Sequence, residues 1–407
     1  MNTLYEDRLQ ESAIFLVLSF IFMICSPLLA LLYIIYGIYR QYVGSVYVFS
    51  LFLGIFAYLI VPFQDIYRQM INYYYWQGKA ISDIDILDLQ LNGIIVYLYQ
   101  FMVNNDIPYD FIRLVEIPVA FSLLYSIFKY KIKESPTLYT YHDINVRLFI
   151  LFLFFDLLYT ASGVRFGFSL CVYLYGLHLI FDKNQKVKSF FFLGFAACFH
   201  SAFIMLGLLS FFIYKAKISF KRVVLVALLC SILVNVFLST FGAQLLGARM
   251  DWYFSSKGNV ASYSKMTLIG FTVFWLQKLC ALPFAFILFK YNNSNSKWCK
   301  MALVWLTLSL VFVSNAVFFY RIWWVFMAIG IYMFLDIERE YFFSTAQIRR
   351  LVVCGLMFCF FYLINYHSML ARYPFRSLCK PVPYILAHHY SKQEVFKIVK
   401  ENGSYKQ

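Results

Sequence analysis

Charged residues are scarce in this chain of 407 residues, and their scarcity is the first constraint on its fold. Only 14% of the residues are charged, whereas 62% are hydrophobic. A soluble domain carries about a quarter charged residues, so this composition excludes an ordinary soluble protein. The apolar residues also form long runs, and residues 13–37 contain no charge at all. Because about 20 residues of helix cross a bilayer core, the sequence predicts an integral membrane protein.

Other absences narrow the class further. The apolar runs do not alternate with polar residues at period 2, which excludes the strands of a transmembrane barrel. The 9 cysteines form no Cys-x-x-Cys pair and have no histidine partner at ligand spacing, so we expect no metal site. No phosphate-binding glycine loop is present. No Gly/Ser-rich linker and no internal repeat divides the chain.

We therefore expect an all-α fold, a polytopic transmembrane helix bundle with about ten full spans. The predicted spans are residues 13–37, 43–63, 111–129, 147–162, 166–181, 223–240, 266–289, 301–315, 319–336 and 350–366. Residues 1–366 then form a single transmembrane domain with outer segments at 65–110 and 241–265. Residues 367–407 form a C-terminal outer tail.

The distribution of charge predicts how the bundle is oriented. The net charge of +15 comes from Lys and Arg in short loops between the apolar runs, which argues against nucleic acid as a partner. The positive-inside rule assigns basic loops, such as residues 129–133 and 183–188, to the cytoplasm. The acidic segment 65–110 is expected outside, and with these assignments both termini lie outside as well.

Two apolar segments do not fit simple crossings. Residues 89–105 carry several Gln and Asn side chains, and we expect an amphipathic helix on the outer interface. Residues 188–214 are flanked by lysines on both sides, so a single crossing would invert the charge pattern that follows. We expect a re-entrant hairpin of two short helices that turns near His200, surrounded by protein or a water-filled cavity.

Ionisable residues in or beside membrane spans are costly and mark candidate functional sites. In the predicted topology, four arginines reach the outer face from separate parts of the chain: Arg68, Arg165, Arg249 and Arg321. His200 lies near the hairpin tip, and Asp156 precedes Arg165 by one helical stretch and can pair with it. A single arginine at a span end is often only a snorkelling anchor. The convergence of four arginines on one face is a stronger signal than any one of them. Guanidinium groups match the geometry of phosphate oxygens, so the cluster indicates an anionic, membrane-embedded substrate such as a lipid phosphate or diphosphate.

Four short motifs occur in a fixed order along the chain. They are DIYRQMINYYYWQ at 65–77, SGVRFGFSLCVYLYGLHLIF at 162–181, KVKSFFFLGFAACFHSAFIML at 186–206 and VPYILAHH at 382–389. Their order resembles the EpsG/Wzy group of polysaccharide polymerases, and the third motif, with His200, is the most specific. Two positions depart from the group. Gln69 stands where a tyrosine is common, and the arginine often found just before the first motif is absent, since Val61, Pro62 and Phe63 stand there.

The resemblance implies a glycosyltransferase on the outer face of a bacterial cytoplasmic membrane. Its donor and acceptor would be glycan repeat units on undecaprenyl diphosphate, and its product an O-antigen, capsule or exopolysaccharide. A flippase and a chain-length regulator would be its partners, together with membrane lipids. The donor is already activated by its diphosphate, so no cofactor and no metal are expected.

For this reaction the main demand is to stabilise charge on the departing diphosphate. Arg165 and Arg321 are the expected catalytic cations. A base for the acceptor hydroxyl is expected at His200 or Asp65, although His200 could equally hydrogen-bond the diphosphate. The expected substrate-binding residues are Arg68, Tyr67, Arg249 and Asp156.

Three other activities compete with this interpretation. A flippase or exporter for the same lipid-linked sugar would show two similar halves, and the sequence shows none. An O-antigen ligase uses the same donor, although the segment 241–265 is short for the large outer loop of a ligase. An acyltransferase would need a His/Asp pair inside a span, whereas His142 and Asp143 lie in a predicted cytoplasmic loop.

Overall fold

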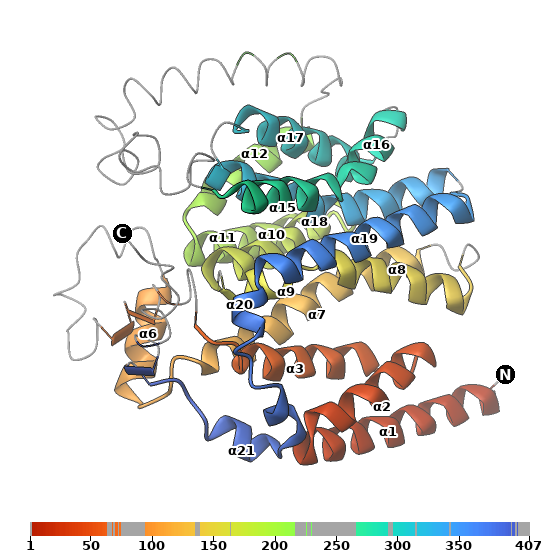
Figure 1. Ribbon diagram of the computed structural model, residues 1–407. Helices are drawn as coiled ribbons and strands as arrows, with labels where there is room; N and C mark the ends of the chain where they lie inside the picture. Colours follow the sequence, from red (N-terminus) through yellow and green to blue (C-terminus); the bar gives the residue numbers. More distant parts are fainter. Residues whose placement is uncertain are drawn as a thin grey trace.

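The computed structural model describes residues 2–62, 94–134, 139–162, 164–215, 266–291, 296–313, 316–341 and 343–391, with single positions at 67–74, 225, 229 and 393–397. The described residues form helices joined by short turns, and they include no β-strand. Most of the longer helices run side by side in one direction across the picture (Figure 1). The prediction of an all-α bundle is confirmed for this part of the chain.

Several helices have the length and composition of membrane spans. Four are long and apolar enough to cross a bilayer: Phe111–Lys133, Leu268–Lys290, Phe319–Glu340 and Thr345–Asn365. Shorter apolar helices accompany them, among them Gln10–Cys25, Pro27–Tyr39 and Ser45–Tyr58. The chain is therefore a multi-pass membrane protein.

The predicted span 13–37 is not one helix. Helix α1 (Asn2–Cys25) ends at Ser26, and α2 (Pro27–Tyr39) begins there. Ser26 has extended backbone angles and its hydroxyl accepts from the Leu29 amide, while Pro27 fills the first helical position, where it needs no N–H partner. The expectation of a single crossing over 13–37 is therefore wrong.

The two halves of this apolar run fold back on each other. The rings of Phe15 on α1 and Tyr33 on α2 stack at 5.1 Å between centroids. The Val43 amide, just after α2, donates to the Ser12 hydroxyl at 3.1 Å. The start of α1 thus lies beside the turn between α2 and α3 (Ser45–Tyr58). The N-terminus is therefore at the end of the bundle opposite to the one that the sequence predicted.

The predicted span 147–162 is also interrupted. Helix α7 (Phe111–Lys133) is followed by α8 (Tyr141–Phe154), which starts with a capping box formed by Thr140 and Asp143. Phe155 leaves the helix in an extended conformation, and Asp156 starts the short helix α9 (Leu157–Ser162). The Asp156 carboxylate accepts from the Tyr159 amide at 2.9 Å, which caps the new helix in place of the lost turn.

Helix α10 (Val164–Phe181) matches the predicted span 166–181, and a helical hairpin follows it. Helix α11 (Lys186–Phe199) and α12 (Ala202–Lys215) meet at a turn that contains His200. The turn between two short helices near His200 agrees with the prediction, whereas their re-entrant placement in the membrane remains a prediction. Helix α6 (Ile94–Asn104), inside the predicted segment 89–105, lies across the direction of the bundle in Figure 1.

The C-terminal half completes the bundle. Helix α15 (Leu268–Leu279) and α16 (Leu282–Lys290) form one long element with a break at Cys280 and Ala281. Helices α17 (Lys297–Val311), α18 (Ala316–Glu340) and α19 (Thr345–Asn365) follow, as predicted from residues 301–366. Helix α18 is central, since it packs against α7, α8, α16 and α17. The predicted span 223–240, apart from two positions, and the segment 241–265 lie outside the described residues.

We call one end of the bundle the basic end; it holds the turns after α2, α7, α10, α16 and α18. There, Lys131 on α7 forms ion pairs with Asp182 and Asp336, and the Trp298 indole donates to Asp182 at 3.1 Å. The other end, which we call the distal end, holds the turns at Ser26 and His200. Buried ion pairs thus join α7, α10 and α18 at the basic end.

The C-terminal tail folds onto the distal end. It contains α20 (His367–Leu370), the 3-10 helix η3 (Phe375–Cys379) and α21 (Val382–Leu386). The Tyr58 hydroxyl at the end of α3 donates to the His388 carbonyl at 2.7 Å, and the Tyr390 hydroxyl donates to the Leu59 carbonyl at 3.0 Å. The tail is therefore packed against the bundle rather than separate from it.

Candidate functional site

Three of the predicted site residues lie close together at the distal end, and two of them contact the Phe166 ring. The guanidinium carbon of Arg321 lies 5.7 Å from the centroid of the Phe166 ring. The His200 ring contacts the same phenylalanine edge-on, with 5.4 Å between centroids. Arg165 precedes Phe166 on α10, and the positive charges of both arginines act on His200. The structure thus brings together Arg165, His200 and Arg321 from three separate elements.

Close packing between α9 and α10 positions Arg165. A Cβ atom added at Gly167 would lie 2.7 Å from the Thr160 Cα atom, which is part of the backbone of α9. Only glycine therefore allows the first turn of α10 to approach α9 this closely. The approach holds Arg165 at the start of α10, beside the interrupted end of α8.

The helix directions add to the positive charge at this site. Helices α10, α12 and α18 all begin at the distal end, with Arg165 in the first turn of α10 and Arg321 in the second turn of α18. The N-terminus of a helix carries a partial positive charge. Two arginines and helix N-termini at one end favour an anion there.

The hairpin turn orients the imidazole of His200. The residue ends α11 with extended backbone angles, and its Nδ1 atom accepts from the Ala202 amide at 3.3 Å. Because Nδ1 is the acceptor, a neutral ring carries its proton on Nε2, as the hydrogen bond assigns it. His200 is therefore arranged as a hydrogen-bond donor through Nε2.

Aromatic side chains connect the cluster to the centre of the bundle. Trp324 on α18 stacks on Phe166 at 5.8 Å, and Tyr159 on α9 meets Trp324 edge-on at 4.3 Å. Tyr159 also contacts Tyr320, the residue before Arg321, at 4.8 Å. These rings are mostly buried, and they fix the relative position of α9, α10 and α18.

A second aromatic group lies in the segment that contains α6. The charge of Arg165 acts on Tyr99 of α6. The Tyr99 and Tyr109 hydroxyls lie 3.3 Å apart, and the Tyr73 hydroxyl donates to the Ile107 carbonyl at 2.7 Å. Tyrosine hydroxyls thus hold the segment around α6 together.

Asp156 lies on the inner side of this cluster and is almost completely buried. Its carboxylate accepts from the Tyr159 amide and, at 3.3 Å, from the Tyr320 hydroxyl. The charge of Lys278 on α15 also acts on it. The pairing of Asp156 with Arg165 remains a prediction, whereas Tyr320 connects Asp156 directly to the helix that carries Arg321.

Lys278 is a buried cation that the sequence analysis missed. Its side chain is 2% exposed, its Nζ atom lies 4.1 Å from the centroid of the Tyr320 ring, and it donates to the Gln277 Oε1 atom at 3.1 Å. Asn365 donates to the same oxygen at 3.3 Å. The signal was present in the sequence, since a lysine in the middle of the span 266–289 is as costly in a membrane as an arginine.

The remaining predicted residues are less informative. Tyr67 is buried at 7% exposure. Asp65, Arg68 and Arg249 lie outside the described residues. Within the described part of the chain, no three His, Cys, Asp or Glu side chains form a group that could hold a metal ion.

The match to a known family covers this site. The sequence model of the EpsG family matches residues 94–377, which is more than half of the chain. The chain belongs to the EpsG family. The matched region runs from α6 to η3 and includes Arg165, His200 and Arg321, and the family is linked to exopolysaccharide biosynthesis. No curated protein and no solved structure matches the chain.

Proposed function

We propose that this EpsG-family protein is a glycosyltransferase that polymerises glycan repeat units carried on undecaprenyl diphosphate. The reaction would take place on the outer face of a bacterial cytoplasmic membrane and would yield an O-antigen, capsule or exopolysaccharide. The observation that carries this proposal is that Arg321 and His200 both contact Phe166 and that the charges of Arg165 and Arg321 both act on His200. A flippase that delivers the repeat units and a chain-length regulator would be partners.

The proposed orientation places the basic end in the cytoplasm, in line with the positive-inside rule. Since α1 and α2 replace one predicted span, the chain would cross about eleven times, with its N-terminus inside and its C-terminal tail outside. The arms α11 and α12 have 14 residues each, and lysines flank the pair on both sides, so a single crossing over this segment would invert the charge pattern that follows. They would form a re-entrant hairpin, and α6 would lie on the outer interface.

In the proposed reaction, a hydroxyl oxygen of the acceptor glycan forms a bond to the anomeric carbon of the donor. The bond from that carbon to the diphosphate oxygen breaks, and the diphosphate leaves with the electron pair. Arg165 and Arg321 stabilise this developing charge, as preorganised cations do in a low-dielectric site. His200 donates its Nε2–H to a diphosphate oxygen, a role that its Nδ1 contact supports over that of a base. Asp65 remains the other candidate to accept the hydroxyl proton.

The test is made in cells that lack the endogenous gene and carry Arg165→Ala or Arg321→Ala. We expect single repeat units on the surface lipid in place of long chains on a glycan gel. Arg376→Ala, an exposed arginine in η3 at the same end, is the matched control and should give normal chains. Normal long chains from both site variants would contradict the proposal. Loss of single repeat units as well would indicate transport or ligation instead of polymerisation.

A further inference from the structure

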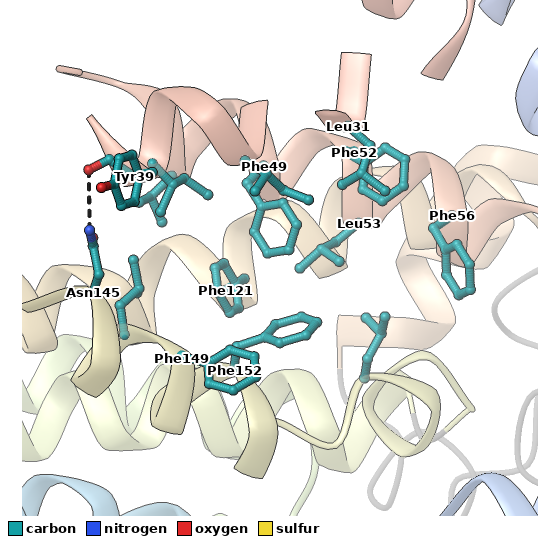
Figure 2. A pocket seen from close by; sticks show the side chains of 15 residues that line it. Leu31, Tyr39, Phe49, Phe52, Leu53, Phe56, Phe121, Asn145, Phe149 and Phe152 are labelled. Atoms are coloured by element: carbon teal, nitrogen blue, oxygen red, sulfur yellow. Dashed lines mark hydrogen bonds between the residues drawn. The ribbon is translucent and has the colours of Figure 1, made fainter. Parts of the chain in front are cut away.

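An apolar groove of about 500 Å³ lies between α2, α3 and α8, with α7 at its floor (Figure 2). No charged side chain contributes to its lining, and only Tyr39 and Asn145 bring polar atoms. Most of the surface is aromatic or branched aliphatic. Among the lining residues are Ile35, Phe49, Phe52, Phe121, Phe149 and Phe152.

The groove exists because its two walls pack against different partners. Helix α3 packs on α7, whereas α8 packs on α19 and α18, so α3 and α8 do not close against each other. Phenylalanine rings span the gap, with centroids 5.4 Å apart for Phe49 and Phe152 and 5.7 Å for Phe49 and Phe121. Along α3 the lining runs from Val46 to Phe56, about 15 Å at 1.5 Å per residue.

The two ends of the groove differ. At the basic end, the Asn145 amide donates to the Tyr39 carbonyl at 3.1 Å and bridges α8 and α2 (Figure 2). At the distal end, the lining ends with Phe56 and Leu157. Leu157 follows Asp156 and is the first residue of α9, a helix of 6 residues, about 9 Å long. Arg165 lies just beyond that helix, so the groove leads toward the candidate site.

The side of the groove is open. Ile35 on α2 is 52% exposed and Phe149 on α8 is 43% exposed, although both line it. Around a membrane-spanning bundle this exposed apolar surface faces lipid. A hydrocarbon chain can therefore enter sideways from the bilayer, without crossing a polar surface.

We propose that this groove holds a segment of the polyprenyl chain of a lipid-linked substrate whose diphosphate lies at Arg165 and Arg321. The inference rests on the proposed function. An uncharged lining fits a hydrocarbon chain and no charged or polar ligand. Leu157 lines the groove and is also the first residue of α9, the helix that leads to Arg165. One lipid-linked molecule can therefore place its hydrocarbon chain in the groove and its diphosphate at the arginines. A phospholipid acyl chain is the competing occupant.

The first experiment identifies the occupant in the full-length protein in nanodiscs. The probe is undecaprenyl diphosphate with a photoreactive diazirine in its chain. We expect crosslinks to peptides from α3 and α8. Unlabelled undecaprenyl diphosphate should prevent them, whereas an excess of phosphatidylglycerol or of inorganic diphosphate should not. Crosslinks confined to other helices, or equal competition by phosphatidylglycerol, would overturn the inference.

The second experiment fills the groove with a larger side chain. Leu31→Trp changes a residue in the lining, and Leu32→Trp changes its neighbour on the lipid-facing side of α2, which is 68% exposed. We expect Leu31→Trp to raise the half-saturating concentration of the long-chain probe about tenfold, because a displaced chain segment loses apolar contact. Leu32→Trp should leave it unchanged. Leu148→Trp, from the opposite wall, repeats the test if Leu31→Trp does not fold.

A short-chain probe completes the design. Geranyl diphosphate should bind all variants equally, since its chain is too short to depend on the length of the groove. Equal affinities of the groove and control variants for the long probe would contradict the inference. These measurements need no turnover. Purified protein that is labelled in the groove but forms no polymer would contradict the proposed function alone, and polymerising protein labelled elsewhere would contradict only the groove.

Discussion

A group of cations at the basic end and the candidate site at the distal end differ in the partners of their charges. At the basic end, Lys131, Arg147 and Arg339 each lie against a carboxylate on another helix. At the distal end, Arg321 lies over the Phe166 ring, His200 contacts the same ring edge-on, and the charge of Arg165 acts on His200. Cations matched to carboxylates hold helices together. Two arginines near helix N-termini, one of them over an aromatic ring, suit an anion that binds and is released.

Removing a carboxylate at the basic end should have the largest effect on stability. Glu338→Ala leaves the guanidinium of Arg147 buried without its main partner; the Arg147 Nε atom bonds Glu338 at 3.1 Å. We expect a loss of about 3–5 kcal/mol in the free energy of unfolding. Denaturant unfolding in detergent measures it. The double variant Arg147→Met/Glu338→Leu should recover most of the loss, and a single variant as stable as wild type would contradict this account.

Removing a cation at the distal end should impair activity and leave stability nearly unchanged. Arg321→Ala should slow polymerisation by purified protein about 10²–10³-fold, the range for loss of one group that stabilises transition-state charge. Arg321→Lys should retain more activity, since charge remains but the planar fork does not. Rates are measured with lipid-linked repeat units, alongside thermal unfolding. If the Arg321 variants lose stability in proportion to their loss of activity, Arg321 has a structural role and not a catalytic one.

Asp156 and Lys278 are expected to interact, and breaking this interaction should cost less stability than Glu338→Ala but more than Arg321→Ala. Lys278→Met should cost about 2–3 kcal/mol, because Asp156 then keeps its hydrogen bonds but loses the neighbouring cation inside the bundle. The double variant Asp156→Asn/Lys278→Met should be more stable than the single one. Its unfolding is measured as for Glu338→Ala. Equal costs for single and double variants would show that the two side chains do not interact.

The smallest effect is expected where the basic end is most exposed. Arg339 and Glu134 form an ion pair whose side chains are 36% and 31% exposed. Solvent screens such pairs, so Glu134→Gln should change stability by less than about 1 kcal/mol. The unfolding midpoint in denaturant reports the change. A cost comparable to that of Glu338→Ala would show that burial does not set the strength of these pairs.

Much of the fold could be predicted because hydropathy and the positions of lysines are properties of whole segments, and each segment by itself indicates a helix or a turn. The turn at His200 followed from lysines at both ends of residues 188–214, since a charged flank resists burial in lipid. The breaks at Ser26 and Asp156 did not follow. Both lie inside apolar runs, where hydropathy is the same on either side, and a cap formed by one side chain interrupts each helix.

The site was predicted in part. Arg165, His200 and Arg321 stood out because ionisable groups are rare in apolar segments, and the structure brings these three together. Lys278 follows the same rule and was missed. Its importance emerges from contact with Tyr320, a residue of another helix that also bonds Asp156.

By itself, the sequence determined that the chain is a multi-pass helical membrane protein, that residues 188–214 turn back, and which family it belongs to. These properties depend on residues close together along the chain. Only the tertiary structure decided that α1 and α2 form a hairpin, that the C-terminal tail packs on α3, and that α3 and α8 leave a groove between them. The physical reason is that the packing of side chains inside an apolar bundle depends on their shapes and on a few buried polar contacts. The side chains in contact come from segments that are distant in the sequence.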